Sequence, residues 1–281
     1  MLALVTIFGD LQYPLAKLVM AILLAVFFAL VILYTARARR GAALYVRPIG
    51  GLSAMNEAIG RATEMGKPVL YVPGMGDVDN IQTIAAVVIL SGVAKLAASY
   101  DTRTIVPIRS PMLFPVAEET VRNAFVDAGR PDSFNRDDVR FLSNDQFAFT
   151  AGVTGIMLRE RPAANIYMGA FWAESLILAE TGFLAGAIQI AGTANVSQLP
   201  FFVAACDYTL IGEELYAASA YLSKNPELLG SLKASDVSKV MWGAIILIGT
   251  LAASNSFLDR FLDRAFGLPT FADLFTFTTG D

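Results

Sequence analysis

The chain has 281 residues, of which 55% are hydrophobic and 16% charged, and its mean hydropathy of +0.55 is high for a soluble globular protein. The formal net charge is −4, so no basic surface is available for nucleic acid, and we expect no nucleic-acid partner. The chain contains no histidine, which excludes Ser-His-Asp and Cys-His catalysis and histidine-ligated metals, and leaves oxygen-ligated magnesium or calcium.

Residues 15–34 are the first predicted element, an apolar run of about 20 residues with Lys17 as its only charge. That length matches the span of a bilayer core, so we predict a transmembrane helix. Arg37, Arg39 and Arg40 follow it, and the positive-inside bias therefore places the next part of the chain in the cytoplasm and residues 1–14 outside.

Residues 44–232 are predicted to form one cytoplasmic α/β domain. Short apolar runs alternate with longer helical ones, which is typical of a Rossmann-like parallel sheet of about five strands flanked by helices. The expected strands are residues 69–72, 104–108, 139–142, 165–168 and 201–206, and the last of these contains the single cysteine, Cys206.

Helices are expected between these strands. Ser53 and Gly66 bound the first, Gly129 closes one that has Pro115 in its first turn, and Ser143 and Gln146 have the spacing of a capping box. Two further helices, residues 81–98 and 181–196, are apolar or rich in small residues nearly all round. We therefore expect their faces to contact other copies of the chain or the membrane surface, and we expect a homo-oligomer.

Residues 237–257 are predicted to be a second transmembrane helix, with its apolar part from residue 240 onward. Lys233 and Lys239 precede that part, which again marks the domain side as cytoplasmic. A buried core helix is the alternative. Residues 258–281 are expected to form an external amphipathic, interfacial tail, with a plain packed tail as the alternative.

A loop containing Gly74 and Gly76 follows the first predicted strand and precedes a helix, as in phosphate-binding loops. The dinucleotide fingerprint is incomplete because Asp79 takes the place of the third glycine, beside Asp77. Two carboxylates repel a phosphate unless a magnesium ion bridges them. The alternative is a tight turn in which Asp79 or Asn80 caps the next helix.

Polar groups follow every predicted strand, and the carboxyl ends of parallel strands are where ligands collect. A composite crevice would use an arginine for an anion, a tryptophan to stack a planar ring, and carboxylates for a hard cation. The ligand-binding candidates are Gly74, Gly76, Arg109, Ser110, Trp172 and Ser175, and the metal candidates are Asp77, Asp79, Asp145 and Glu174. Asn144, Asp207 and Tyr208 are also expected there. Each residue taken alone is equally explained as a cap or turn residue.

The stretches PVLYVPGMGDVDNIQTIA, AANIYMGAFWAESLILAETGFLAGAIQIAGTANVSQLPFF and AACDYTLIGEELYAASAYL resemble an uncharacterised family of bacterial membrane proteins, described only as a domain of unknown function. The resemblance covers most of residues 50–232. It implies a bacterial cytoplasmic (inner) membrane protein with this anchored layout, and it implies no activity.

The leading functional hypothesis is a membrane-anchored, self-associating binding or scaffolding module, with the lipid bilayer and a membrane complex as partners. The alternative is a magnesium-dependent enzyme acting on a nucleotide or another phosphorylated small molecule at the strand-end crevice. A pore or transporter subunit ranks last, because the first predicted span offers only Lys17 as a polar group.

Overall fold

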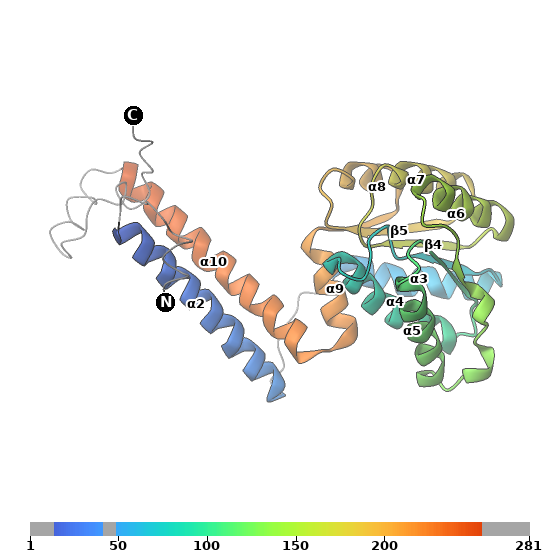
Figure 1. Ribbon diagram of the computed structural model, residues 1–281, viewed down its shortest axis with the longest axis horizontal. Coiled ribbons are helices and arrows are strands. Elements are labelled where there is room, and N and C mark those ends of the chain that lie inside the picture. Colours follow the sequence, from blue (N-terminus) through green and yellow to red (C-terminus); the bar gives the residue numbers. More distant parts are fainter. Residues whose placement is uncertain (1–13, 42–48, 255–281) are drawn as a thin grey trace. The chain divides into compact units, whose positions relative to one another are not determined.

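A computed structural model of the chain describes residues 14–41 and 49–254 (Figure 1). The chain divides into two compact units: Tyr45–Asn225 form an α/β unit, and Met1–Leu44 with Pro226–Asp281 form the other. Within the second unit the structure describes two long helices. The predicted external segments, residues 1–14 and 258–281, lie outside the described residues except for Pro14, and so do the last residues of the predicted second span.

The α/β unit is built on a six-stranded sheet in the order β3-β2-β1-β4-β5-β6, and every neighbouring pair is parallel. This is the strand order of the doubly wound Rossmann fold. The strands are β1 (Val69–Val72), β2 (Thr104–Ile108), β3 (Val139–Phe141), β4 (Ala164–Met168), β5 (Ile188–Thr193) and β6 (Tyr208–Ile211). The predicted α/β class is confirmed, with six strands instead of about five.

The prediction was wrong at β5 and β6. Residues 181–196 are not one helix: the helix Glu174–Leu184 ends within this range, and β5 begins at Ile188. The predicted strand at residues 201–206 lies in a helix, Leu199–Ala205, and the sixth strand starts only at Tyr208. Both faces of β5 are covered, so its polar residues Gln189 and Thr193 are buried together with its apolar ones, and the strand has no alternation of apolar and exposed polar residues to identify it.

Helices cover both faces of the sheet (Figure 1). One face carries α3 (Gly50–Met65), α4 (Ile81–Ser99), α5 (Leu113–Asp127) and α9 (Glu213–Ser223). The other carries α6 (Gln146–Glu160), α7 (Glu174–Leu184) and α8 (Leu199–Ala205). Two short 3-10 turns, Pro131–Ser133 and Arg136–Asp138, lead into β3.

The apolar character of α4 is explained within the unit. Helices α5 and α9 pack along its two sides and the sheet lies beneath it, so Ala86, Ile89 and Leu90 are fully buried. Contact of α4 with other copies of the chain or with lipid is therefore not needed to explain why this helix is so apolar. At its start Asn80 is the N-cap, accepting from the Gln82 amide at 2.8 Å, as the turn interpretation expected.

Other predicted helix ends are partly confirmed. Gly66 adopts a left-handed conformation (φ +61°) directly after α3, although that helix begins at Gly50 and not at Ser53. Helix α6 is capped by Asp145, whose Oδ1 accepts from the Ala148 amide at 2.8 Å, so the cap is two residues later than the predicted Ser143.

Three described helices are long and apolar enough to cross a membrane: α2 (Pro14–Arg39), α4 and α10 (Pro226–Ser254). The sequence predicts two such helices, one before and one after the domain. Half of the apolar window of α4 is buried inside the protein, against none for α2 and 17% for α10. By this measure α4 belongs to the α/β core, whereas α2 and α10 expose most of their apolar side chains.

Helices α2 and α10 lie side by side and antiparallel (Figure 1). Near one end of the pair Arg39 forms an ion pair with Glu227, and Gly230 packs against the backbone of Thr35. Small buried residues of α10, namely Gly230, Ala234 and Ser238, recur every four positions and form one stripe. Such stripes let two helix backbones approach closely.

Candidate functional site

The strand order changes direction between β1 and β4, where a doubly wound sheet normally opens a ligand crevice. In this protein the loops after these two strands contact each other directly. The Met75 amide donates to the Ala170 carbonyl at 2.7 Å, and a Cβ on Gly74 would lie 2.5 Å from that same oxygen. A Cβ on Gly169 would lie 2.6 Å from the Pro73 carbonyl oxygen. The glycines are thus needed for loop-to-loop packing.

Gly76, the second predicted glycine, packs against the start of α4. A Cβ there would lie 2.2 Å from Thr83 Oγ1 and 3.1 Å from Asn80 Cβ. Only a residue without a side chain fits at this distance. The close approach is made to the chain's own helix, so loop packing alone accounts for both predicted glycines.

Arg109 joins three strand-end loops. Its Nη1 donates to the Met75 carbonyl at 2.6 Å and its Nε to the Asn144 carbonyl at 3.0 Å. Its guanidinium carbon lies 5.5 Å from the centre of the Trp172 ring, a cation-π contact. The structure therefore brings the predicted Arg109 and Trp172 together, with two donor nitrogens of the guanidinium already engaged by carbonyl oxygens.

Ser110 and Asp77 form a second link at the same edge. The Ser110 hydroxyl donates to Asp77 Oδ1 at 2.7 Å and accepts from the Met112 and Leu113 amides at 3.2 and 3.3 Å, at the start of α5. The same Asp77 oxygen accepts from the Val78 amide at 2.8 Å. These contacts are those of a turn and a helix cap.

The four predicted metal ligands occupy different surroundings. Asp79 is exposed, Asp145 caps α6, and Asp77 is bonded to Ser110. Glu174 is fully buried, and its two carboxylate oxygens accept from the Trp172 amide (2.7 Å) and the Gln146 side chain (2.5 Å). Over residues 14–41 and 49–254 the structure contains no group of three or more acidic or cysteine side chains arranged to hold a metal ion.

Ser175 is also buried at this edge. Its hydroxyl lies 2.8 Å from the Trp172 carbonyl oxygen and 2.7 Å from Gln198 Oε1. The network continues through residues that the sequence analysis missed. Gln82 Oε1 accepts from the Ala194 amide at 2.8 Å, and Asn195 donates to the Phe171 carbonyl at 2.7 Å. They follow β5 or face it, so recognising that strand would have pointed to them.

The carboxyl edge of the sheet is therefore a set of hydrogen bonds that tie loops together. Arg109 serves these ties through Nε and Nη1, each bonded to a carbonyl oxygen. Asp207 is not at this edge, because it precedes β6; its Oδ2 accepts from the Gln189 amide at 2.8 Å. Its expected place in the crevice was wrong.

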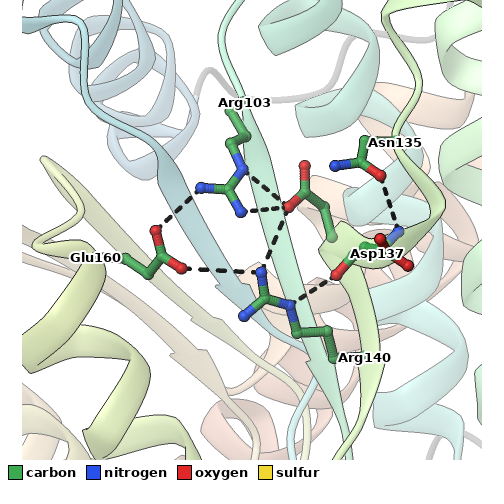
Figure 2. Close-up of polar contacts among 6 residues, drawn as sticks. Arg103, Asn135, Asp137, Arg140 and Glu160 are labelled. Atoms are coloured by element: carbon green, nitrogen blue, oxygen red, sulfur yellow. Dashed lines mark hydrogen bonds and ion pairs between the residues drawn. The ribbon is translucent and has the colours of Figure 1, made fainter.

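A second polar cluster lies at the opposite edge of the sheet and was not predicted (Figure 2). Arg103 contacts Asp138 at 2.7 Å and Glu160 at 3.0 Å, and Arg140 lies 3.7 and 3.8 Å from the same two carboxylates. The Asp138 side chain is only 9% exposed. The hydrogen bond from Arg103 to Asp138 raises the pKa of Arg103, and the contact with Glu160 raises it further by a smaller amount. The cluster joins β2, β3 and the end of α6.

A small pocket of about 230 Å³ adjoins this cluster, and its walls include Asp101, Thr104, Phe125 and Asp138. The Thr104 hydroxyl is buried there without a hydrogen-bond partner among the described residues. A solvent-filled pocket satisfies such a group with water, so the pocket does not by itself identify a ligand.

The outer surface of α7 and α8 is apolar, and we refer to it as the α7–α8 face. It is made of Leu176, Ile177, Phe183, Leu184, Phe201 and Val203, whose exposed fractions range from 38% to 73%. A groove of about 640 Å³ runs between the two helices, with Glu180 and Asp207 among its polar walls. An exposed apolar surface of this kind, rimmed by polar residues, is typical of a contact site for another macromolecule.

Cys206 lines the same groove. Burial, and secondly the negative charge of Asp207, raise the pKa of its thiol to about 12. Because the thiolate is the reactive form, this position is unsuited to a nucleophile.

The chain belongs to the family described as Domain of unknown function (DUF6754), whose model matches residues 10–261. Comparison with curated proteins gives no match, and comparison with solved structures gives none either.

Proposed function

We propose that this member of the DUF6754 family is a membrane-anchored module that associates with itself and serves as a binding or scaffolding subunit of a membrane complex. The observation that carries the proposal is the exposure of large apolar side chains around α2 and α10. Leu18, Phe28 and Ile32 of α2 are 56%, 56% and 68% exposed, and Val240 and Ile246 of α10 are 75% and 66% exposed. Water is a poor solvent for such surfaces, and lipid is a good one.

The antiparallel pairing of α2 and α10 supports a simple topology. The chain leaves α2 at its Arg39 end and enters α10 at Pro226, which is the same end of the pair. Both helices therefore cross the membrane with the α/β unit on one side. Arg37, Arg39 and Arg40 are at that end, so the positive-inside bias assigns it to the cytoplasm of a bacterial cell.

The α7–α8 face supports a protein partner for the α/β unit. Residues 162–223, which contain all of α7 and α8, include no lysine or arginine, and the acidic residues Glu180 and Asp207 line the groove between the two helices. Acidic lipid headgroups attract basic surfaces and repel acidic ones. An apolar, acidic surface is therefore suited to another protein, either a second copy or a different subunit, and not to the surface of the bilayer.

The magnesium-dependent enzyme remains a prediction without a specific observation in its favour. Arg109 and Asp77, two of its proposed ligand groups, already make contacts that tie the loops together. We therefore place the binding function on the α7–α8 face and on the paired helices.

Anchoring and orientation are tested by labelling single cysteines in intact cells. In a Cys206→Ala background, we expect Gly41→Cys to be protected from an impermeant maleimide and Gly280→Cys to be labelled. Both should react after the membrane is permeabilised, which controls for buried positions. Labelling of Gly41→Cys with protection of Gly280→Cys would invert the orientation, and release of the protein by alkaline carbonate would refute the anchoring itself.

Self-association is tested by expressing two differently tagged copies together and extracting them in mild detergent. We expect each tag to purify the other, and we expect no transfer when the two membranes are mixed only after separate extraction at low concentration. A strictly monomeric chain in detergent and in lipid nanodiscs would refute this part of the proposal.

A further inference from the structure

The register of α2 against α10 is determined by two contacts at one end of the pair. A Cβ on Gly230 would lie 2.5 Å from Thr35 Cα, and Glu227 pairs with Arg39. Since the helices are antiparallel and rise equally, about 1.5 Å per residue, each step back along α2 matches one step forward along α10. Lys233 is therefore level with Ile32, Asp236 with Ala29, and Lys239 with Val26.

This register offsets the two apolar runs. The uncharged part of α2 lies between Lys17 and Arg37, and that of α10 begins after Lys239. Only residues 18–25 of α2 face residues 240–247 of α10, a shared length of about 12 Å. A bilayer core is about 30 Å thick. The pair cannot cross lipid without taking charged residues of one helix into it.

The depth of the pair is better set by α2, which has the longer described uncharged run and exposes Phe28, Ile32 and Leu33 by 56%, 68% and 60%. In that position Lys233 and Asp236 lie roughly 7 and 12 Å inside the level of Arg37. Asp236 is exposed on the surface of α10, and no ion pair to it occurs among the described residues of the chain. Charged groups at such depth face protein or one another, because isolated charges in lipid are costly.

Lys233 and Asp236 form what we call the charged stripe of α10. Resting on the proposed membrane anchoring and self-association, we propose that a second copy of the α2/α10 pair covers this charged stripe. The stripe is self-complementary: Lys233 and Asp236 carry opposite charges three residues apart on one face of α10. In a two-fold symmetric contact between copies of the same membrane orientation, Asp236 of each copy lies about 4.5 Å deeper than Lys233 of the other, a distance that a lysine side chain can span, so two reciprocal ion pairs can form. An acidic lipid headgroup would neutralise Lys233 but would be repelled by Asp236.

The test uses charge exchange between two tagged full-length copies in nanodiscs of neutral phosphatidylcholine. Asp236→Lys copies should associate with one another at least about tenfold more weakly than wild type, because like charges then face each other, and Lys233→Asp copies should do the same. A mixture of the two variants should associate like wild type, since each reciprocal contact regains one positive and one negative group. Restoration in the mixture also shows that neither variant is misfolded.

Asp132→Lys makes the same charge change at an exposed position of the α/β unit and should leave association unchanged. Wild-type association by Asp236→Lys copies, or failure of the mixture to restore it, would overturn this contact while leaving self-association intact. Loss of binding to acidic vesicles in Lys233→Asp, with self-association unchanged, would assign the stripe to lipid headgroups and also overturn it. If the wild type itself does not associate, the proposed function fails.

Discussion

Gly182 in α7 gives the sharpest test of how the α/β unit is packed beneath its exposed face. A Cβ on this glycine would lie 2.1 Å from Gln189 Oε1 and 2.6 Å from both Asn165 Nδ2 and Tyr167 Oη. The Gln189 amide cannot swing away easily, because its Nε2 donates to the Ala179 and Ala205 carbonyls at 2.8 and 2.9 Å and its Oε1 accepts from Tyr167.

The cost of Gly182→Ala follows from these contacts. Overpacking a dense interior costs about 1–3 kcal/mol, and each buried hydrogen bond that is displaced adds about 1 kcal/mol. Alanine is favoured over glycine in a helix by about 0.5–1 kcal/mol, which offsets part of this. We expect a net loss of about 2 kcal/mol in the free energy of unfolding, or roughly 4–8 °C in Tm for a domain of this size.

The measurement is thermal unfolding of the purified full chain in detergent, followed by near-ultraviolet circular dichroism. Gly60→Ala is the matched control: a Cβ on this helical glycine of α3 would meet no heavy atom within 4 Å, so only the helix preference acts and stability should rise by about 0.5–1 kcal/mol. If Gly182→Ala were as stable as wild type, α7 would not be held this close to the sheet, and the geometry of the α7–α8 face would be wrong.

Two further predictions concern charged and reactive groups. Asp138→Asn should lower the free energy of unfolding, measured by chemical denaturation, by about 1–2 kcal/mol; the loss is smaller than for a fully buried ion pair because water screens Arg103, which is 41% exposed. Asp127→Asn is the control: both Asp127 and its partner Lys95 are exposed, so the free energy of unfolding should change by less than about 0.5 kcal/mol. Equal effects would show that the cluster adds nothing to stability. Cys206 should react with iodoacetamide roughly a thousandfold more slowly than a free thiol of ordinary pKa 9.0, with reaction accelerating as the pH approaches about 12. Rapid alkylation at pH 8 would contradict its burial beside Asp207.

The exposed surfaces of this protein are more informative about function than its strand-end loops. Arg109, Ser110 and Glu174 were predicted as ligand groups, and each is engaged with the protein itself. Among the residues that the structure describes, no contact within the protein explains the exposed apolar side chains of the α7–α8 face or the charges of the charged stripe of α10. Both surfaces support the proposed contacts with protein and the proposed scaffolding role.

The sequence alone determined the features that depend on neighbouring residues. Strands β1 and β2 were predicted to the residue, because turn residues bound short apolar runs on both sides. The end of α3 at Gly66 follows from local backbone chemistry in the same way, whereas the cap of α4 was expected at Asp79 or Asn80 and the structure shows that it is Asn80. The long apolar run of α2 and the membership of the family were equally legible.

Only the tertiary structure decided what depends on residues far apart in the chain. β5 was missed because a strand buried on both faces has no two-residue alternation, so that its sequence pattern resembles that of a buried helix, and only pairing with β4 and β6 distinguishes the two. The strand order, in turn, brings Gly74 against Ala170 across the switch point, so glycines that suggested a phosphate site serve loop packing. The register of α2 on α10 is likewise set by small residues of one helix meeting the other, and this register places only residues 18–25 of α2 beside residues 240–247 of α10, so the two uncharged runs overlap along only part of their length.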